Sequence, residues 1–378
     1  MKKYDAVIAG YFCLDMVPVF QKSQKEISTS GILKPGSLIE IDGLGFSAGG
    51  VVANTGAAMK KFGRKVFLNG IIGEDLLGKI ARDWFEKLNL SEGIQVTNRA
   101  GTAFSIVLAP PGIDRIFLES PGCNKIFDIR FIDFEAASQS RLFHFGYPPL
   151  LRQFYLHNGD ELQSTFSGIQ QMGVVTSMDF SLPDRQSESG KQNWLHIMER
   201  VLPYTDIFVP SLEEALQIMV PDQYEKILSV AGNSDVVDQV PISLIREIGK
   251  KIIDCGVKIL VIKAAHRGIY LLTGDISPLN KERGLDLSGS DWSYRELWCN
   301  AYPADPAKVK NATGAGDTAI AAFLTAILDG NTAEHALKYA AIAGRNNLYC
   351  HDIYDELDDW QSMEKEVKIL SGGICHFK

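Results

Sequence analysis

The sequence predicts an α/β fold: a doubly wound, mostly parallel sheet flanked by helices on both faces. Short apolar segments rich in β-branched residues recur along the chain and indicate buried strands. Segments with apolar residues at helical spacing, such as 77–90, lie between them. Because strands and helices alternate, we expect right-handed crossovers that place the strands parallel in one sheet. The expected strands are residues 6–9, 66–72, 142–145, 174–178, 207–209 and 259–262.

Two segments break this alternation, and with their flanking residues they cover about 16–48 and 100–127. Neither offers a long helix. In the second, the turn-forming residues 110–114 separate two β-type runs and predict a hairpin. We expect the two segments to form a small antiparallel sheet that acts as a lid on a single domain spanning 1–378. The alternative is that the two segments are surface loops without a function.

Two further segments lie in the C-terminal third of the chain. Residues 276–293 are polar and rich in glycine, serine and charge, which predicts a surface loop. Residues 355–370 carry apolar side chains at helical spacing, which predicts an amphipathic closing helix.

Charge and composition exclude several classes of function. The chain has 38 Lys and Arg against 46 Asp and Glu, a formal net charge of −8, which argues against a nucleic-acid-binding or anionic-membrane-binding protein. No stretch approaches the roughly 18 apolar residues that a membrane span needs. The six cysteines are scattered without metal-type spacing, which favours free thiols in a reducing cytoplasm. We therefore expect a cytoplasmic protein with a small-molecule ligand.

The most informative run is 311–328, where a glycine-rich turn leads directly into an apolar helix. The small residues Gly314, Ala315 and Gly316 let backbone N–H groups converge at the helix N-terminus, where the helix dipole favours an anion such as a phosphate. Asp317 follows in the first turn. Its carboxylate fits a general base that accepts a proton from an attacking hydroxyl group, and it equally fits an N-cap of the helix.

This run resembles the C-terminal signature of the ribokinase-like, or PfkB, family of carbohydrate kinases. A second signature of that family matches Gly49-Gly50-Val-Val-Ala-Asn54. Other family-like elements follow in the expected order, at residues 73–78, 122–124 and 211–214. The resemblance covers about residues 5–350. It implies a ribokinase-like fold and an enzyme that moves the γ-phosphoryl group of ATP to a hydroxyl group of a sugar, with Asp317 as general base.

The resemblance also implies an acceptor site, whose residues are Asp15, Gly49, Gly50, Asn54 and Asn124. The chemistry is suitable, because a carboxylate accepts bonds from hydroxyl groups and an amide both donates and accepts. Paired glycines let the backbone approach a ligand closely. From the residues alone, Asp15 could equally be a turn residue at a strand end, and Asn54 a polar group on the side of a helix.

The ATP site implied by the resemblance contains Glu214, Lys263, Gly268, Thr313, Gly314 and Gly316. Glu214 would hold Mg²⁺ through water, which suits a cation that keeps its hydration shell. The alternative is that Ser211 and Glu214 form a capping box at a helix start. Lys263 is either a point charge toward the phosphates or a solvated residue at a strand end. Asp179 either supports the magnesium network or caps a turn.

Several positions depart from the family pattern. Ser211 stands where relatives have Asn, and Ala265 replaces a glycine of the turn that contacts ATP. Asn311 replaces an Asp near a monovalent-cation site, and Ala341 an Asn that contacts adenine in some relatives. The sequence therefore leaves open whether a monovalent cation binds. It also leaves open two other functions, a nucleoside kinase with the same fold and a non-catalytic sugar sensor. An exposed lid edge also favours a homodimer.

Overall fold

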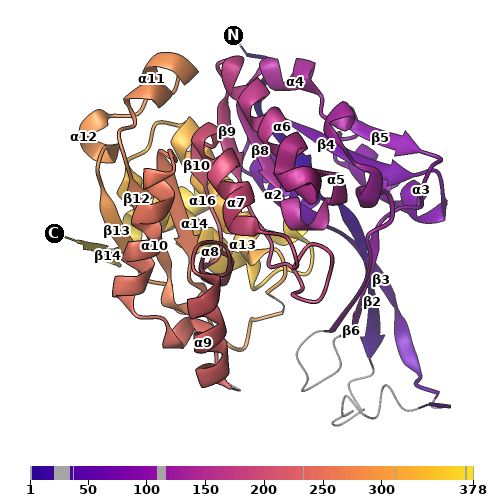
Figure 1. Ribbon diagram of the computed structural model, residues 1–378. Coiled ribbons are helices and arrows are strands. Elements are labelled where there is room, and N and C mark those ends of the chain that lie inside the picture. The colour runs from indigo at the N-terminus through magenta and orange to yellow at the C-terminus, as the bar shows by residue number, and fades with distance from the viewer. Residues whose placement is uncertain are drawn as a thin grey trace.

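The computed structural model describes residues 2–20, 35–36, 38–108, 116–232, 234–310, 312–370 and 373–377. Within them, a large sheet contains β1 (Tyr4–Gly10), β4 (Val66–Gly73), β5 (Ile94–Thr97), β8 (Ser140–Gly146), β9 (Val175–Met178), β10 (Ile207–Phe208), β11 (Ile259–Lys263), β12 (Ile269–Thr273), β13 (Glu296–Cys299) and β14 (Ile374–His376). The strand order is β14-β13-β12-β11-β10-β9-β8-β1-β4-β5. The seven strands from β11 to β5 run parallel to one another, whereas β12, β13 and β14 are antiparallel to their neighbours. The predicted mostly parallel sheet is confirmed (Figure 1).

Helices cover both faces of the large sheet (Figure 1). One face packs against α2 (Gly50–Lys61), α3 (Leu76–Lys87), α13 (Ala315–Leu328), α14 (Ala333–Asn347), α15 (Ile353–Glu356) and α16 (Trp360–Ile369). The other packs against α4 (Phe134–Ser138), α5 (Arg152–Tyr155), α6 (Asp160–Gln171), α7 (Trp194–Val201), α8 (Leu212–Met219), α9 (Pro221–Ala231) and α10 (Ile242–Asp254). Short 3-10 helices span Gly122–Ile126, Ile129–Phe131, Pro148–Leu150, Leu156–Gly159, Leu202–Tyr204, Val236–Gln239 and Ala265–Arg267.

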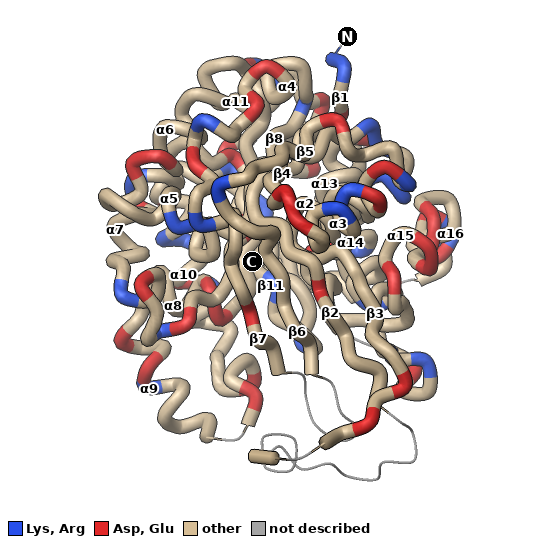
Figure 2. The backbone as a smooth tube through the Cα atoms, turned by 90° about the vertical axis from the view of Figure 1, so that its right-hand side faces the viewer, with Lys and Arg blue, Asp and Glu red and all other residues tan. Residues whose placement is uncertain are grey.

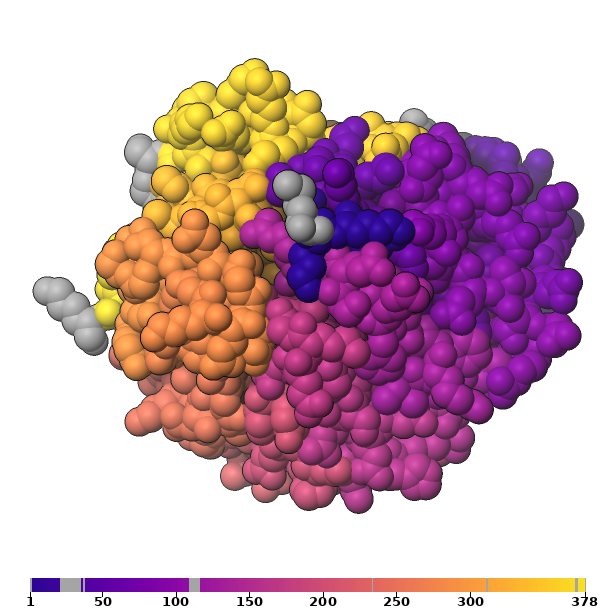
Figure 3. Space-filling model, turned by 90° about the horizontal axis from the view of Figure 1, so that it is seen from above, coloured from indigo at the N-terminus to yellow at the C-terminus, as the bar shows by residue number. Residues whose placement is uncertain are grey.

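The alternation of side chains along β1 shows why these strands are apolar throughout. Ala6 and Ile8 belong to the core under α2 and α13, whereas Val7 and Ala9 belong to the core on the opposite face. Because successive side chains of a strand point to opposite faces, a strand covered by helices on both sides needs an unbroken apolar run. Figure 3 shows the N-terminal part of the chain, in indigo to magenta, beside the C-terminal part, in orange to yellow, on one face of the molecule.

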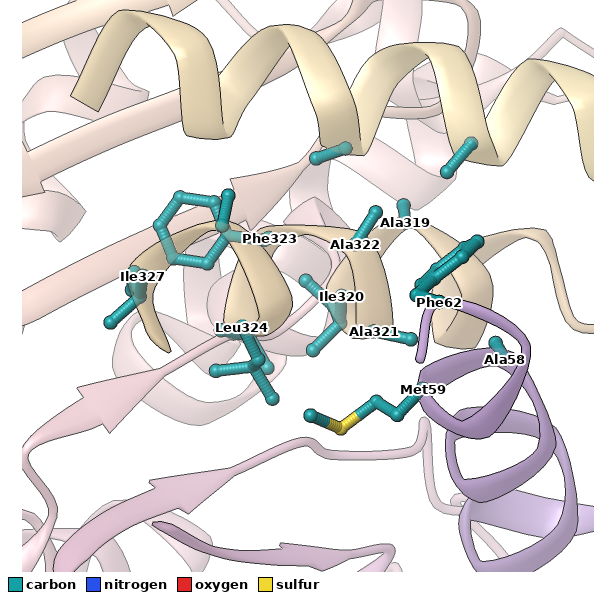
Figure 4. Packing of buried hydrophobic residues seen from close by; sticks show 14 of the residues in the cluster. Ala58, Met59, Phe62, Ala319, Ile320, Ala321, Ala322, Phe323, Leu324 and Ile327 are labelled. Atoms are coloured by element: carbon teal, nitrogen blue, oxygen red, sulfur yellow. The ribbon is translucent and has the colours of Figure 1, made fainter. Parts of the chain in front are cut away.

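Helix α13 is central to the first core. Its residues Thr318 to Leu328 are all buried, and α14 and α2 pack against it (Figure 4). Small residues permit this close packing: a Cβ atom on Gly344 of α14 would lie 3.3 Å from the Cβ of Ala319. The apolar helix predicted after the glycine-rich turn is confirmed, and its burial fixes the position of its first turn.

A separate small sheet is built from β2 (Cys13–Phe20), β3 (Ile41–Gly49), β6 (Phe104–Leu108) and β7 (Ile116–Ser120), in the order β3-β2-β6-β7. It extends away from the large sheet (Figures 1 and 2). The prediction of a wholly antiparallel sheet was wrong, because β2 and β6, which come from the two separate segments, pair in parallel. Of the two predicted segments, residues 21–34, 37 and 109–115 lie outside the described part of the chain, and the 110–114 turn lies within this last stretch.

The prediction of a surface loop at 276–293 was wrong. This segment forms α11 (Ser277–Arg283) and α12 (Gly289–Trp292) and places Leu279 and Trp292 fully in the core. Its polar composition concealed a few widely spaced apolar residues, which are enough to anchor short helices. The closing helix predicted at 355–370 is α16, preceded by α15.

A glycine at the end of β1 lies very close to the backbone of β8. Gly10 has φ +121°, and a Cβ atom there would lie 1.8 Å from the carbonyl oxygen of Gly146 on β8. We expect Gly10→Ala to lower the free energy of unfolding by about 2–4 kcal/mol, measured by urea denaturation. Gly43→Ala on β3 is the matched control, because no atom lies within 4 Å of its added Cβ. Equal effects of the two substitutions would contradict the steric argument.

Candidate active site

The first turn of α13 lies at the centre of the site. Gly314 precedes the helix with φ +76°, and a Cβ atom on it would lie 2.8 Å from Ile353 Cδ1, so only glycine fits there. No side chain among the described residues caps this helix end. Ala315 N donates to the carbonyl oxygen of Ala312 over 3.3 Å, whereas the N–H groups of Gly316 and Asp317 have no such partner among the described residues. These two N–H groups could bind an anion.

The carboxylate of Asp317 is buried and held by three donors. Asn54 Nδ2 donates to Oδ2 over 2.9 Å, and Thr55 Oγ1 donates to Oδ1 over 3.4 Å. The hydroxyl group of Tyr147, which follows β8, also donates to Oδ1. Asn54 and Thr55 lie on α2, so hydrogen bonds join the two helices that carry the two sequence signatures. These contacts orient the carboxylate toward the space in front of α13.

A cavity of about 420 Å³ opens in front of α13. Its lining includes Tyr147, Asp179, Glu214, Lys263, Gly314, Gly316 and Asp317. Lys263, at the end of β11, donates from Nζ to Asp179 Oδ1 over 2.6 Å. A Cβ atom on Gly316 would lie 3.7 Å from the same Nζ, so the ammonium group sits beside the start of the helix.

The charges in this cavity are unbalanced. Burial, together with the repulsion of Glu214 and Asp317, raises the pKa of Asp179 despite the opposing attraction of Lys263. Burial lowers the pKa of Lys263, but the attraction of Asp179, Glu214 and Asp317 outweighs it and leaves this pKa raised. Among the described residues, four carboxylates, those of Asp179, Glu213, Glu214 and Asp317, thus line the cavity with one ammonium group, an arrangement that a bound cation would relieve.

Glu214 has a structural role as well as a place in the cavity. Ser211 and Glu214 form the capping box that the sequence allowed, because Ser211 N donates to Glu214 Oε2 over 2.7 Å and Glu214 N donates to Ser211 Oγ over 3.3 Å. Among the described residues, no cluster of three or more His, Cys, Asp or Glu forms a metal site. The nearby oxygens of Glu214 and Asp179 fit Mg²⁺, which keeps several waters and takes few protein ligands.

A second cavity, of about 790 Å³, continues from the first and shares Lys263, Ala265 and Gly316 with it. Its remaining lining is mostly apolar and includes Ile269, Tyr302, Pro303, Ala340, Ala341 and Leu348. Gly268 also lines it. The φ of Gly268 is +119°, and a Cβ atom there would lie 2.1 Å from the carbonyl oxygen of Cys299. A polar cavity joined to an apolar one suits a ligand with a charged end and a flat apolar end.

Two of the predicted acceptor residues, Asp15 and Asn54, line the same small cavity. This cavity has a volume of about 50 Å³, and Thr313 also lines it. Thr313, predicted for ATP, thus lies on the acceptor side. A Cβ atom on Gly49 would lie 2.7 Å from Asp15 Oδ2, and Gly50 has φ +80°, so the glycine pair is required by space and backbone conformation.

Asn124 has a different environment. It is fully buried, and its Nδ2 donates to the carbonyl oxygen of Phe12 over 2.8 Å, which fixes the connection between β1 and β2. Its Oδ1 has no partner among the described residues. The side chain does not appear in the lining of the cavities described above. Asn311 lies outside the described residues.

Two residues of the site were missed by sequence reasoning. Thr55 directly follows Asn54, the last residue of the N-terminal signature, so its position next to a predicted site residue could have indicated it. Tyr147 follows a strand in a run with two prolines, and nothing in its spacing indicated a contact with Asp317, 170 residues away.

A doubly wound sheet with a glycine-rich turn at the start of a buried helix, and a buried carboxylate in the first turn of that helix, is typical of phosphotransferases. Residues 23–355 match the model of the pfkB family of carbohydrate kinases, so the chain belongs to this family. The predicted family and the ribokinase-like fold are confirmed.

Solved structures with the same fold cover nearly the whole chain. Arabidopsis thaliana ribokinase with ribose and ATP is 20% identical over 97% of this chain and 99% of that one, with a TM-score of 0.69. An E. coli protein assigned as ribokinase II, in complex with ATP and Mg²⁺, is 16% identical over 97% and 100%, with a TM-score of 0.65. Methanocaldococcus jannaschii nucleoside kinase is 15% identical over 98% and 100%, with a TM-score of 0.63. A search of curated proteins found no match.

The buried carboxylate of Asp15 makes the stability of the fold depend on pH, which can be tested. Burial raises the pKa of Asp15 to about 6, the charge of Glu119 adds to this, and a hydrogen bond from Cys13 opposes it. Between about pH 4 and 6 the folded chain therefore binds the proton more tightly than the unfolded chain, so stability falls as pH rises through this window. We expect Asp15→Asn to raise the free energy of unfolding by about 1–3 kcal/mol at pH 7.5, with little change at pH 4, in urea denaturation.

The control for this experiment is Asp42→Asn, which removes an exposed carboxylate at the far end of β3. It should give the same small change at both pH values. A gain in stability for Asp15→Asn that does not depend on pH would contradict the account.

Proposed function

We propose that the chain transfers the γ-phosphoryl group of ATP to a hydroxyl group of a sugar or sugar derivative, with Asp317 as the general base. The observation that carries this proposal is the placement of a buried, oriented carboxylate beside the amides of Gly316 and Asp317 at the start of α13, where no side chain of the described residues caps the helix. An acceptor hydroxyl between them would meet a proton acceptor on one side and a phosphate site on the other.

In the proposed reaction, the acceptor oxygen attacks the γ-phosphorus while Asp317 takes the proton of the hydroxyl group. The bond from the γ-phosphorus to the bridging oxygen breaks, and ADP leaves with the electron pair. The amides of Gly316 and Asp317 would stabilise the negative charge that develops on the transferred group, with Lys263 as a nearby point charge. The Ala315 N–H already donates to the carbonyl oxygen of Ala312 and would support the turn. Gly314 would give this turn its shape.

The nucleotide would place its adenine in the apolar cavity near Gly268 and its phosphates toward Lys263 and Gly316. Bound Mg²⁺ would neutralise phosphate charge, and Glu214 with Asp179 would hold it through water. The E. coli neighbour is a complex with ATP and Mg²⁺, which supports this choice of cofactors. Ala341 lines this cavity, and its small side chain leaves more room than the Asn that some relatives have at this position.

The acceptor would bind near Asp15, Gly49, Gly50 and Asn54, between the carboxyl ends of the strands and the small sheet. The small sheet would act as a lid whose closure excludes water, because a bound water would otherwise compete for the phosphoryl group. Asn124 would support this site indirectly by fixing the chain at Phe12. The ribose in the complex of the Arabidopsis neighbour supports a sugar acceptor.

A nucleoside acceptor is the second candidate, because one neighbour is a nucleoside kinase. Incubation of the protein with ATP, Mg²⁺ and a panel of sugars and nucleosides, with ADP release as readout, separates the two. Binding of a sugar without ADP release from any acceptor would favour a sugar sensor instead.

The role of Asp317 gives the most direct prediction about turnover. Asp317→Asn should keep the size and shape of the side chain and remove its basicity, while its amide donates where one carboxylate oxygen accepted. We therefore expect kcat to fall by at least roughly 100-fold with acceptor affinity largely retained. Asp329→Asn, at the other end of α13, is the matched control and should leave kcat near the wild-type value. A kcat of Asp317→Asn close to the wild-type value would refute the proposed base.

The small sheet also supports a proposal about assembly. Phe46, Met16, Ile106 and Leu118 are register partners across its four strands and form an apolar row on one face. Phe46 and Leu118 are 46% and 49% exposed. An apolar face of this kind is typical of an interface, so we propose a homodimer through the small sheet.

Light scattering tests this assembly. We expect the wild-type protein to be a dimer and Leu118→Glu to shift it toward monomer. Leu76→Glu on α3, where the side chain is 74% exposed, should leave the dimer intact. A wild-type monomer at micromolar concentration would contradict the proposal.

No helix in the described part of the chain is long and apolar enough to cross a membrane. The cytoplasmic location stays a prediction from the scattered cysteines.

A further inference from the structure

A polar row crosses the small sheet on the face opposite the apolar row. Ser47 on β3 pairs with Asp15 on β2, Asp15 pairs with Ser105 on β6, and Ser105 pairs with Glu119 on β7. Because side chains of paired residues lie on the same face, these four side chains share one face. Figure 2 shows the acidic positions along β2 and β7. The row contains Asp15, so it faces the acceptor side of the site.

Glu119 is fixed at the end of this row. The hydroxyl group of Tyr11 donates to Glu119 Oε1 over 2.6 Å. The Tyr11 ring lies 6.1 Å from the ring of Tyr147, centroid to centroid, and Tyr147 donates to Asp317. A chain of contacts thus runs from Glu119 to the proposed base. The negative charge of Glu119 also acts on Asp15, whose pKa is raised first by burial and then by this charge.

The surroundings of Glu119 do not favour an anion. Beyond it lies a cavity of about 530 Å³. Lys125 and Arg152 line this cavity, but so do the carboxylates of Asp184 and Glu188. Arg152 is already paired with Glu188 through two hydrogen bonds of 2.7 Å. With Glu119, three carboxylates therefore face two cations, and an acidic group on the ligand would add repulsion.

We propose that Glu119 is a specificity-determining residue for the acceptor: it binds a hydroxyl group away from the reacting one and selects neutral, polyhydroxylated sugars over sugar acids and sugar phosphates. This inference rests on the proposed kinase function. Asp15 and Glu119 are separated by one strand, so their backbones lie about 10 Å apart, two strand spacings. A sugar between them can offer hydroxyl groups to both carboxylates, each of which accepts hydrogen bonds only. Tyr11 is a positioning residue that holds Glu119.

The test compares neutral acceptors with acidic ones. The probes are D-ribose, D-fructose and D-glucose as neutral sugars, with D-gluconate and the 6-phosphates of glucose and fructose as acidic ones. The wild-type enzyme should favour its best neutral acceptor over every acidic probe by at least about tenfold in kcat/KM. Glu119→Gln keeps the side-chain shape and should raise KM for the neutral acceptor about tenfold, the size of one charge-assisted hydrogen bond, with kcat changed less. It should also reduce the preference for neutral acceptors.

Two further variants separate charge from position. Tyr11→Phe should raise KM without reducing the preference for neutral acceptors, because the charge of Glu119 remains. Asp42→Asn removes one charge from the same sheet at its far end and should change neither quantity. A wild-type preference for an acidic probe, or unchanged KM and preference in Glu119→Gln, would overturn this inference alone. Absence of ADP release with every sugar and nucleoside would overturn the proposed function and this inference together.

Discussion

The site depends on the contact between α2 and the first turn of α13. Asn54 and Thr55 bind the carboxylate of Asp317 across more than 260 residues of sequence. Both helices are buried in the core on one face of the large sheet, so neither can shift without repacking that core. This contact brings the two segments that carry the family signatures together, and the other parts of the site are arranged around it.

The negative charges of the site are unbalanced in a way that bound ligands would relieve. Asp179, Glu213, Glu214 and Asp317 line one cavity in which Lys263 is the one cation among the described residues. Burial raises the pKa of both Asp179 and Asp15. Folding therefore has to overcome repulsion among these carboxylates, and binding of a cation or of hydroxyl donors reduces it. Such a conflict between stability and binding is expected at a functional site rather than in a structural core.

Much of the fold and the centre of the site could be predicted because their signals are local. The run from Gly314 to Asp317 specifies a turn and a helix start through neighbouring residues, and alternating strand and helix patterns specify the layers. Tyr147 and Glu119 could not be predicted, because their roles depend on tertiary packing and on strand register, which a sequence pattern does not contain. The parallel pairing of β2 with β6 was missed for the same reason. The helices at 277–292 were missed because their few apolar residues are widely spaced in a polar segment.

A crystal structure with an accepted sugar and a non-hydrolysable ATP analogue tests the central claim most directly. The account predicts an acceptor hydroxyl about 2.6–3.2 Å from an oxygen of Asp317, with the γ-phosphate against the amides that follow Gly314. A complex in which the sugar hydroxyl groups lie away from Asp317, or the γ-phosphate away from the start of α13, would contradict it.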